Sequence, residues 1–127
     1  MKPAMITGAA CAAERYYGVD IAADGALVVA ARPSGGKAAT RFPAGAAGVS
    51  ALSRSIAGES AHPHVCICSR GAIALSLATA LMALPGIEVT LVAPHAIAHA
   101  VQVGRAATPA TPEEGALRLA RLAERLF

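Results

Sequence analysis

The spacing of hydrophobic and polar positions divides the chain into two halves. In the first half, short runs rich in β-branched and aromatic residues predict strands over 15–22, 26–33 and 37–43. Turns that contain glycine, 23–25 and 34–36, separate these runs. Because the turns are tight, the three strands are expected to form an antiparallel meander.

From residue 46 onward, helical and extended patterns alternate. Apolar residues at helical spacing predict helices over 46–58, 72–86, 95–104 and 111–127. The helix over 72–86 is apolar on nearly every side and is therefore expected to be buried. Short apolar runs predict strands over 64–69 and 87–94, which should lie parallel because helices connect them. The expected fold is an α/β domain with a five-stranded mixed sheet flanked by helices, and this order is typical of ribonuclease H-like domains.

Length and composition fit one folded domain. The chain has 127 residues, of which 55% are hydrophobic and 15% charged, so it is expected to fold rather than to be disordered. We expect residues 1–14 to form a flexible N-terminal tail and residues 15–127 to form the domain. The apolar run near the start is too short for a signal peptide, and no run is long enough to span a membrane. The three cysteines are an odd number, which favours a reducing, cytoplasmic location.

Charge leaves several partners open. The formal net charge is +3 and the sequence pI is about 9.1, a balance compatible with nucleic acid but not diagnostic of it. Arg118, Arg121 and Arg125 are spaced to form one basic stripe on the last predicted helix. The stripe is interpreted as a solvated face, as a contact to a DNA backbone, or as a partner surface in a dimer.

The stretch "AHPHVCICSRG" at 61–71 combines the residue types that bind soft metal ions. Its four candidate ligands are His62, His64, Cys66 and Cys68. Residues i and i+2 lie nearly 7 Å apart along a strand, so one ion cannot bind all four side chains. We therefore interpret Cys66 and Cys68 as small hydrophobic residues in a strand that is buried on both faces. His95 and His99 are spaced i, i+4. They are interpreted either as two surface histidines or as a pair that binds one metal ion from the same side of a helix.

Several short motifs occur in an order that resembles a known family. They are Gly18-Val19-Asp20 in the first strand, Arg41-Phe42-Pro43 before a helix with Gly48, Cys68 to Gly71, and Pro94 followed by Gly104-Arg105. In this order they resemble the bacterial DEDD-type insertion-sequence transposases related to the Piv invertase, over roughly residues 16–126. The N-terminal domain of that family is similar to the Holliday-junction resolvase RuvC, which implies a ribonuclease H-like fold.

The resemblance also implies an active site that this chain has largely lost. The family holds two Mg²⁺ ions with four acidic residues, and Asp20 fills the first position. The second position, a Glu in the family, falls on Cys68, which is a poor ligand for Mg²⁺. The closing motif has no Asp here, so Glu113 or Glu114 is the candidate substitute.

Other residues acquire roles only through this resemblance. Ser69 and His95 would lie beside the site, and an alternative hypothesis is that Asp20, Cys68 and His95 would together bind zinc. Arg105, with the stripe on the last helix, would contact nucleic acid. The family's second domain, which supplies a nucleophilic serine, has no counterpart before Phe127.

The preferred hypothesis is a degenerate, free-standing pseudoenzyme that binds nucleic acid or protein without cleavage and needs no cofactor. One alternative is an active Mg²⁺-dependent nuclease or transposase that uses Asp20 with Glu113 or Glu114. Another is a purely structural interaction module. DNA and a second copy of the chain are the expected partners, the dimer forming through an apolar helix surface, and no membrane contact is expected. The strand of Asp20 should be central and lie next to the strand of Cys68.

Overall fold

The computed structural model describes residues 14–32, 39–97 and 111–126. The chain order of the elements is β1 (Glu14–Ile21), β2 (Leu27–Arg32), β3 (Thr40–Phe42), α2 (Ala46–Glu59), β4 (His62–Cys68), α3 (Gly71–Met82), β5 (Glu88–Val92), α4 (Pro94–Ile97) and α5 (Pro112–Leu126).

The five strands form one mixed sheet in the order β3-β2-β1-β4-β5. The pairs β1–β2 and β2–β3 are antiparallel, whereas β1–β4 and β4–β5 are parallel. The predicted α/β class and five-stranded mixed sheet are thus confirmed. So is the prediction that the strand of Asp20 is central and adjacent to the strand of Cys68.

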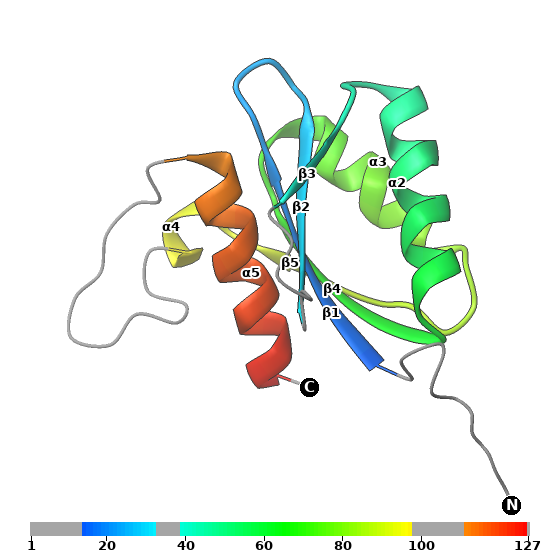
Figure 1. Cartoon of the computed structure of the whole chain (residues 1–127). Helices are drawn as coiled ribbons and strands as arrows, with labels where there is room; N and C mark the ends of the chain where they lie inside the picture. Colours follow the sequence, from blue (N-terminus) through cyan, green and yellow to red (C-terminus); the bar gives the residue numbers. More distant parts are fainter. Residues whose placement is uncertain (1–13, 33–38, 98–110, 127) are drawn as a thin grey trace, which may run out of the picture.

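Helices cover both faces of the sheet (Figure 1), with α2 and α3 on one face and α5 on the other. The alternation of side chains in β1 explains this arrangement. Tyr17, Val19 and Ile21 belong to the core under α2 and α3. Gly18 and Asp20 lie on the opposite face, where α5 crosses them.

The two cores differ in the size of their side chains. Under α2 and α3 the buried residues are mostly large aliphatic ones, including Leu52, Ile56, Leu77 and Leu81. Under α5 the buried helix residues are Gly115, Ala116, Leu119, Ala120 and Ala123. A Cβ on Gly18 would overlap the backbone of Ala116 and Ala120, so the helix backbone lies directly on β1. The small residues bring α5 unusually close to the sheet.

Some predicted elements differ from the structure. The helix expected over 72–86 is wrong in its burial, because α3 buries one side and exposes Leu75 and Met82. It also ends earlier, at Met82, since Pro85 disfavours helical geometry in the residue before it. The first strand begins at Glu14, one residue before the expected start.

The helix predicted over 111–127 is present as α5, and other predicted segments lie outside the described residues. Thr111 caps this helix, because its Oγ1 accepts a hydrogen bond from the backbone N–H of Glu114 at 3.1 Å. The helix expected over 95–104 is described only as α4, and the rest of it lies outside the described residues. The expected tail lies outside them too, except for its last residue.

Candidate functional site

Asp20 lies near the carboxyl end of β1 and is enclosed by three elements. It is only 4% exposed, and its Oδ1 accepts a hydrogen bond from the backbone N–H of Ile21 at 2.8 Å. The Nε of Arg70, from the turn between β4 and α3, lies 3.6 Å from the same oxygen. On the other side, a Cβ on Gly115 would collide with Oδ2, so α5 fits over the carboxylate only because glycine stands there.

Cys68 ends β4 and lies beside Asp20, where the resemblance places a glutamate. Its side chain is fully buried. The pKa of the Cys68 thiol is raised to about 11, mainly by burial and also by the negative charge of Asp20, while the positive charge of Arg70 opposes the rise. Burial alone raises the pKa of Cys66 to about 11. Both thiols are therefore neutral near pH 7. The full burial of both side chains confirms the interpretation of the two cysteines as small buried residues.

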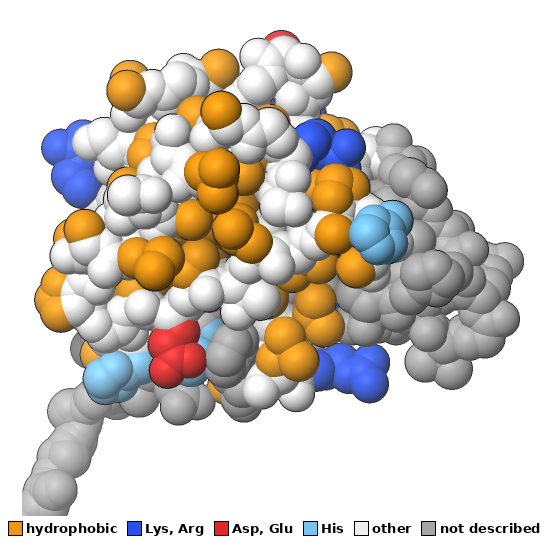
Figure 2. All heavy atoms as spheres, turned by 180° about the vertical axis from the view of Figure 1, so that it is seen from behind, with side chains coloured by type: hydrophobic (Ala, Val, Ile, Leu, Met, Phe, Trp, Pro, Cys, Tyr) orange, Lys and Arg blue, Asp and Glu red, His pale blue; other side chains and the backbone are white. Residues whose placement is uncertain are grey.

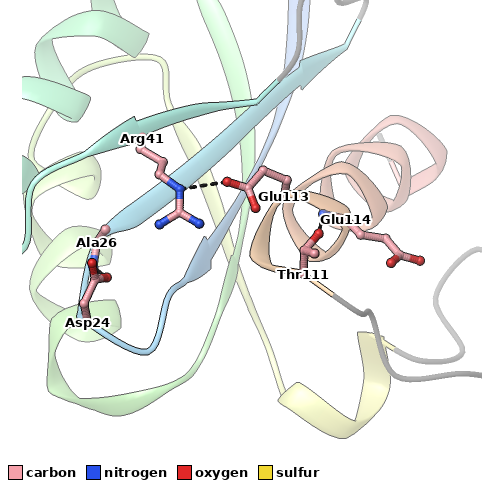
Figure 3. A network of polar contacts seen from close by, with 6 residues as sticks. All are labelled: Asp24, Ala26, Arg41, Thr111, Glu113 and Glu114. Atoms are coloured by element: carbon pink, nitrogen blue, oxygen red, sulfur yellow. Dashed lines mark hydrogen bonds and ion pairs between the residues drawn. The ribbon is translucent and has the colours of Figure 1, made fainter.

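The two candidate substitute acids, Glu113 and Glu114, point to opposite sides of α5 (Figure 3). The Nε of Arg41, from β3, donates to Oε2 of Glu113 at 2.7 Å. This hydrogen bond is the main reason that the pKa of Glu113 is lowered. Glu114 accepts a hydrogen bond from Arg118, one helical turn further on, at 2.9 Å. The structure therefore pairs each of the two acids with an arginine.

The histidines lie in different environments. His62 is exposed at the start of β4, whereas His64 is buried and stacks on Tyr16 with ring centroids 5.4 Å apart. Nδ1 of His64 is 3.4 Å from Oε1 of Glu88 on the neighbouring strand. His95 is exposed on α4. Across the described residues, no three His, Cys, Asp or Glu side chains are arranged to hold a metal ion, so Asp20, Cys68 and His95 do not form such a group.

The remaining predicted residues are spread over the surface. Arg121 and Arg125 are exposed on α5, and Ser69 is exposed after β4, where its backbone N–H donates to the carbonyl of Val92 at 2.9 Å. Arg105 and His99 lie outside the described residues.

The sequence analysis missed Arg70, and it recognised Arg41 as part of a motif but not as the partner of Glu113. Arg70 follows β4, which is parallel to β1, and the carboxyl ends of parallel neighbouring strands lie at the same edge of a sheet. The sequence position of Arg70 just after β4 could therefore have predicted that it lies near Asp20. Arg41 meets Glu113 across 72 positions of sequence, and no local pattern reveals such a pair.

Asp20, Glu113 and Glu114 thus each lie beside a guanidinium group, from Arg70, Arg41 and Arg118 respectively. No protein-family model and no curated protein matches the chain. Among the helices that the structure describes, none has the length and apolar character needed to cross a bilayer.

Proposed function

We propose that this chain is a ribonuclease H-like domain, related to the N-terminal domain of DEDD-type transposases, that works by binding and does not cleave nucleic acid. The observation that carries the proposal is the position of Arg70, whose Nε lies 3.6 Å from Oδ1 of the buried Asp20. Asp20 is the acid that the family resemblance assigns to the metal site.

A cation beside Asp20 opposes the two-metal chemistry of the family. Two divalent ions held close together repel each other strongly unless several anionic oxygens surround them. Arg70 adds a positive charge at this place, and the neutral thiol of Cys68 adds no negative one. Glu113, held by Arg41, would have to leave a short hydrogen bond to contribute. Each of these features lowers the affinity of the site for Mg²⁺.

The distribution of charge favours a protein partner over nucleic acid. Binding to a phosphate backbone depends on cationic side chains that are free to neutralise phosphates. Around α5, four arginines already lie in ion pairs with carboxylates: Arg32, Arg41, Arg70 and Arg118. Protein is therefore the preferred class of partner.

Arg121 and Arg125 support nucleic acid as a second candidate. Both are exposed on α5, one turn apart, and no ion pair joins either of them to a carboxylate within the described residues. Two free cations of this kind give weak, salt-sensitive binding that is independent of sequence.

The cleavage test uses the purified chain with supercoiled plasmid, a branched junction and single-stranded DNA, in Mg²⁺ and separately in Mn²⁺. We expect no cleavage by the chain or by Asp20→Ala. Cleavage that is lost in Asp20→Ala would overturn the proposal and establish the nuclease alternative. Cleavage that persists in Asp20→Ala would come from a contaminant, and a repurified sample would have to be inactive for the proposal to stand.

A binding test separates the two candidate partners. Fluorescence anisotropy with a labelled DNA duplex is measured at low and moderate salt for the chain and for Arg121→Glu/Arg125→Glu. The matched control is Arg54→Glu, an exposed arginine on α2 at the other face. Binding that the double variant abolishes and the control retains would favour nucleic acid, whereas weak binding that both variants share would favour the protein partner.

A further inference from the structure

The edge of the sheet at β5 gathers exposed hydrophobic side chains. Leu91 of β5 is 41% exposed, and Leu75 and Met82 of α3 are 59% and 68% exposed. Ile73, Ala80 and Leu84 line a groove that α3 shares with α2. At 100° per residue, Leu75 and Met82 fall on the opposite flank of α3, away from α2. Residues 89 and 91 face α3, because their partners in β4, Val65 and Ile67, belong to the core under α2 and α3.

The backbone of β5 is open along the same edge. The carbonyl of Val92 accepts from the N–H of Ser69, and in a parallel pair this places the groups of Glu88, Thr90 and Val92 toward β4. The N–H and C=O groups of Val89 and Leu91 therefore point outward. Among the described strands, none pairs with this side of β5. An edge of this kind is a ready template for another strand.

We propose that a second copy of this chain docks on this edge, with β5 and its symmetry mate antiparallel about a twofold axis at Thr90. In this register Val89 faces Leu91 of the other copy, and the outward groups of these residues exchange hydrogen bonds in both directions. Leu91 packs beside Val89 of the other copy on the α3 side. Leu75 and Met82 of both copies extend this apolar contact.

The antiparallel register favours a second copy as the occupant, because it brings no like charges together. Glu88 is the only charged residue of β5, and the antiparallel register places it opposite Val92 of the other copy, away from its own symmetry mate. Glu88 also has His64 of its own chain nearby, with Oε1 and Nδ1 3.4 Å apart. The whole of α3 carries no charge. Two copies can therefore associate without bringing like charges face to face. The surface also lacks the cations that binding to nucleic acid would need.

Figure 2 shows the molecule from behind, and on this face hydrophobic and uncharged side chains predominate while Lys and Arg lie toward its margin. The opposite edge of the sheet is different, because β3 has only three residues, includes Arg41 and is followed by Pro43. Short length, charge and proline are the usual means of protecting an edge strand, and β5 has no proline or lysine. This proposal does not rest on the absence of cleavage, since it uses another part of the molecule.

Sedimentation equilibrium of the full chain tests the dimer. We expect a dimer at micromolar concentration, and we expect Leu91→Lys, which places two lysines close to the twofold axis, to raise the dissociation constant about tenfold or more. Leu126→Lys is the matched control, because Leu126 is a leucine on α5 that is 55% exposed. The control should remain as dimeric as the wild type. A monomeric wild type, or equal dissociation of the two variants, would overturn the proposal, and circular dichroism establishes that both variants are folded.

A disulfide tests the register in the same protein. Opposed residues of a non-hydrogen-bonded antiparallel pair have Cα atoms about 4.5 Å apart, which lies within the range that a disulfide spans. Cys11, the third cysteine of the chain beside the buried Cys66 and Cys68, is first replaced by serine so that it cannot form the cross-link. In this Cys11→Ser background, Thr90→Cys should form a covalent dimer under mild oxidation with diamide. Thr40→Cys, on the opposite edge strand, should remain monomeric on a denaturing gel. A dimer in solution that links through residue 40 and not through residue 90 would overturn the β5 contact.

Discussion

The two faces of the sheet are built from side chains of different size, and they carry different amounts of charge. The face under α2 and α3 is filled mainly by leucine, isoleucine and valine, and α3 has no charged residue. The face under α5 is filled largely by glycine and alanine, and α5, Asp20 and His64 form ion pairs on this face. Large side chains hold a helix away from a sheet, whereas small ones let the backbones meet.

This difference explains why Asp20 is enclosed rather than open. Because Gly18 and Gly115 have no side chains, α5 lies directly over β1 and covers the carboxylate. Larger residues at the same places would leave a space above Asp20. The close approach of α5 and the closed environment of Asp20 are thus consequences of the same small residues.

The largest expected effect breaks this close contact. Gly18→Ala should destabilise the fold by about 4 kcal/mol or more, because its Cβ would meet the backbone of α5, which cannot move aside as a flexible side chain can. Urea denaturation followed by circular dichroism measures the change. Gly58→Ala is the control, since a Cβ there meets no atom within 4 Å and alanine favours the helical conformation of α2. Similar midpoints for the two variants would show that α5 does not lie against β1.

Truncation of one leucine on each face compares the two cores. Leu77→Ala removes a large side chain among other large ones, and Leu119→Ala removes one that packs mainly among small residues. Each should cost about 2–5 kcal/mol, with Leu77→Ala nearer the upper value. The reason is that partly exposed neighbours of Leu119, such as Leu122, are free to fill the space.

Urea midpoints with equal m-values measure this difference. A larger loss for Leu119→Ala would mean that the α5 side carries more of the stability than the size of its residues indicates.

The sequence predicted the sheet well because its signals are local. Runs of β-branched and aromatic residues between glycine turns marked β1 and β2, and β4 was recognisable as a short apolar run. The environment of Asp20 was harder to predict, because it depends on Gly115, 95 positions further along the chain, and on the guanidinium of Arg70. Residues that meet only through tertiary packing leave no periodic pattern. The exposure of Leu75 and Met82 was missed for the same reason, since apolar content alone does not tell which side of a helix the sheet covers.

Alkaline pH provides a smaller effect that is specific to the α5 face. The pKa of Cys66 and Cys68 is raised from 9.0 to about 11 in the folded chain. Above pH 9 the unfolded chain loses these protons and the folded chain keeps them, so the free energy of unfolding should fall between pH 9 and 11. Each tenfold difference in proton affinity between the folded and unfolded thiol corresponds to about 1.4 kcal/mol of this loss.

Urea unfolding at pH 8 and at pH 10.5 measures this loss. Cys66→Ala/Cys68→Ala is the control, because it removes both thiols and leaves the other titrating groups in place. The double variant should lose less stability over this interval than the wild type. An equal loss in both proteins would mean that the thiols do not contribute to the alkaline effect.

The smallest expected effect concerns the outer surface of the α5 side. Nε of Arg32, at the end of β2, lies 3.2 Å from Oε1 of Glu124 on α5, and both side chains are more than a third exposed. Water and salt screen such a pair, so a double-mutant cycle with Arg32→Ala and Glu124→Ala should give a coupling of about 0.2–1 kcal/mol that decreases in 1 M salt. A coupling well above this range would show that the charges on this face stabilise α5 as much as its small buried residues do. In that case the ion pairs, and not the close contact at Gly18, would be the main reason that α5 lies over Asp20.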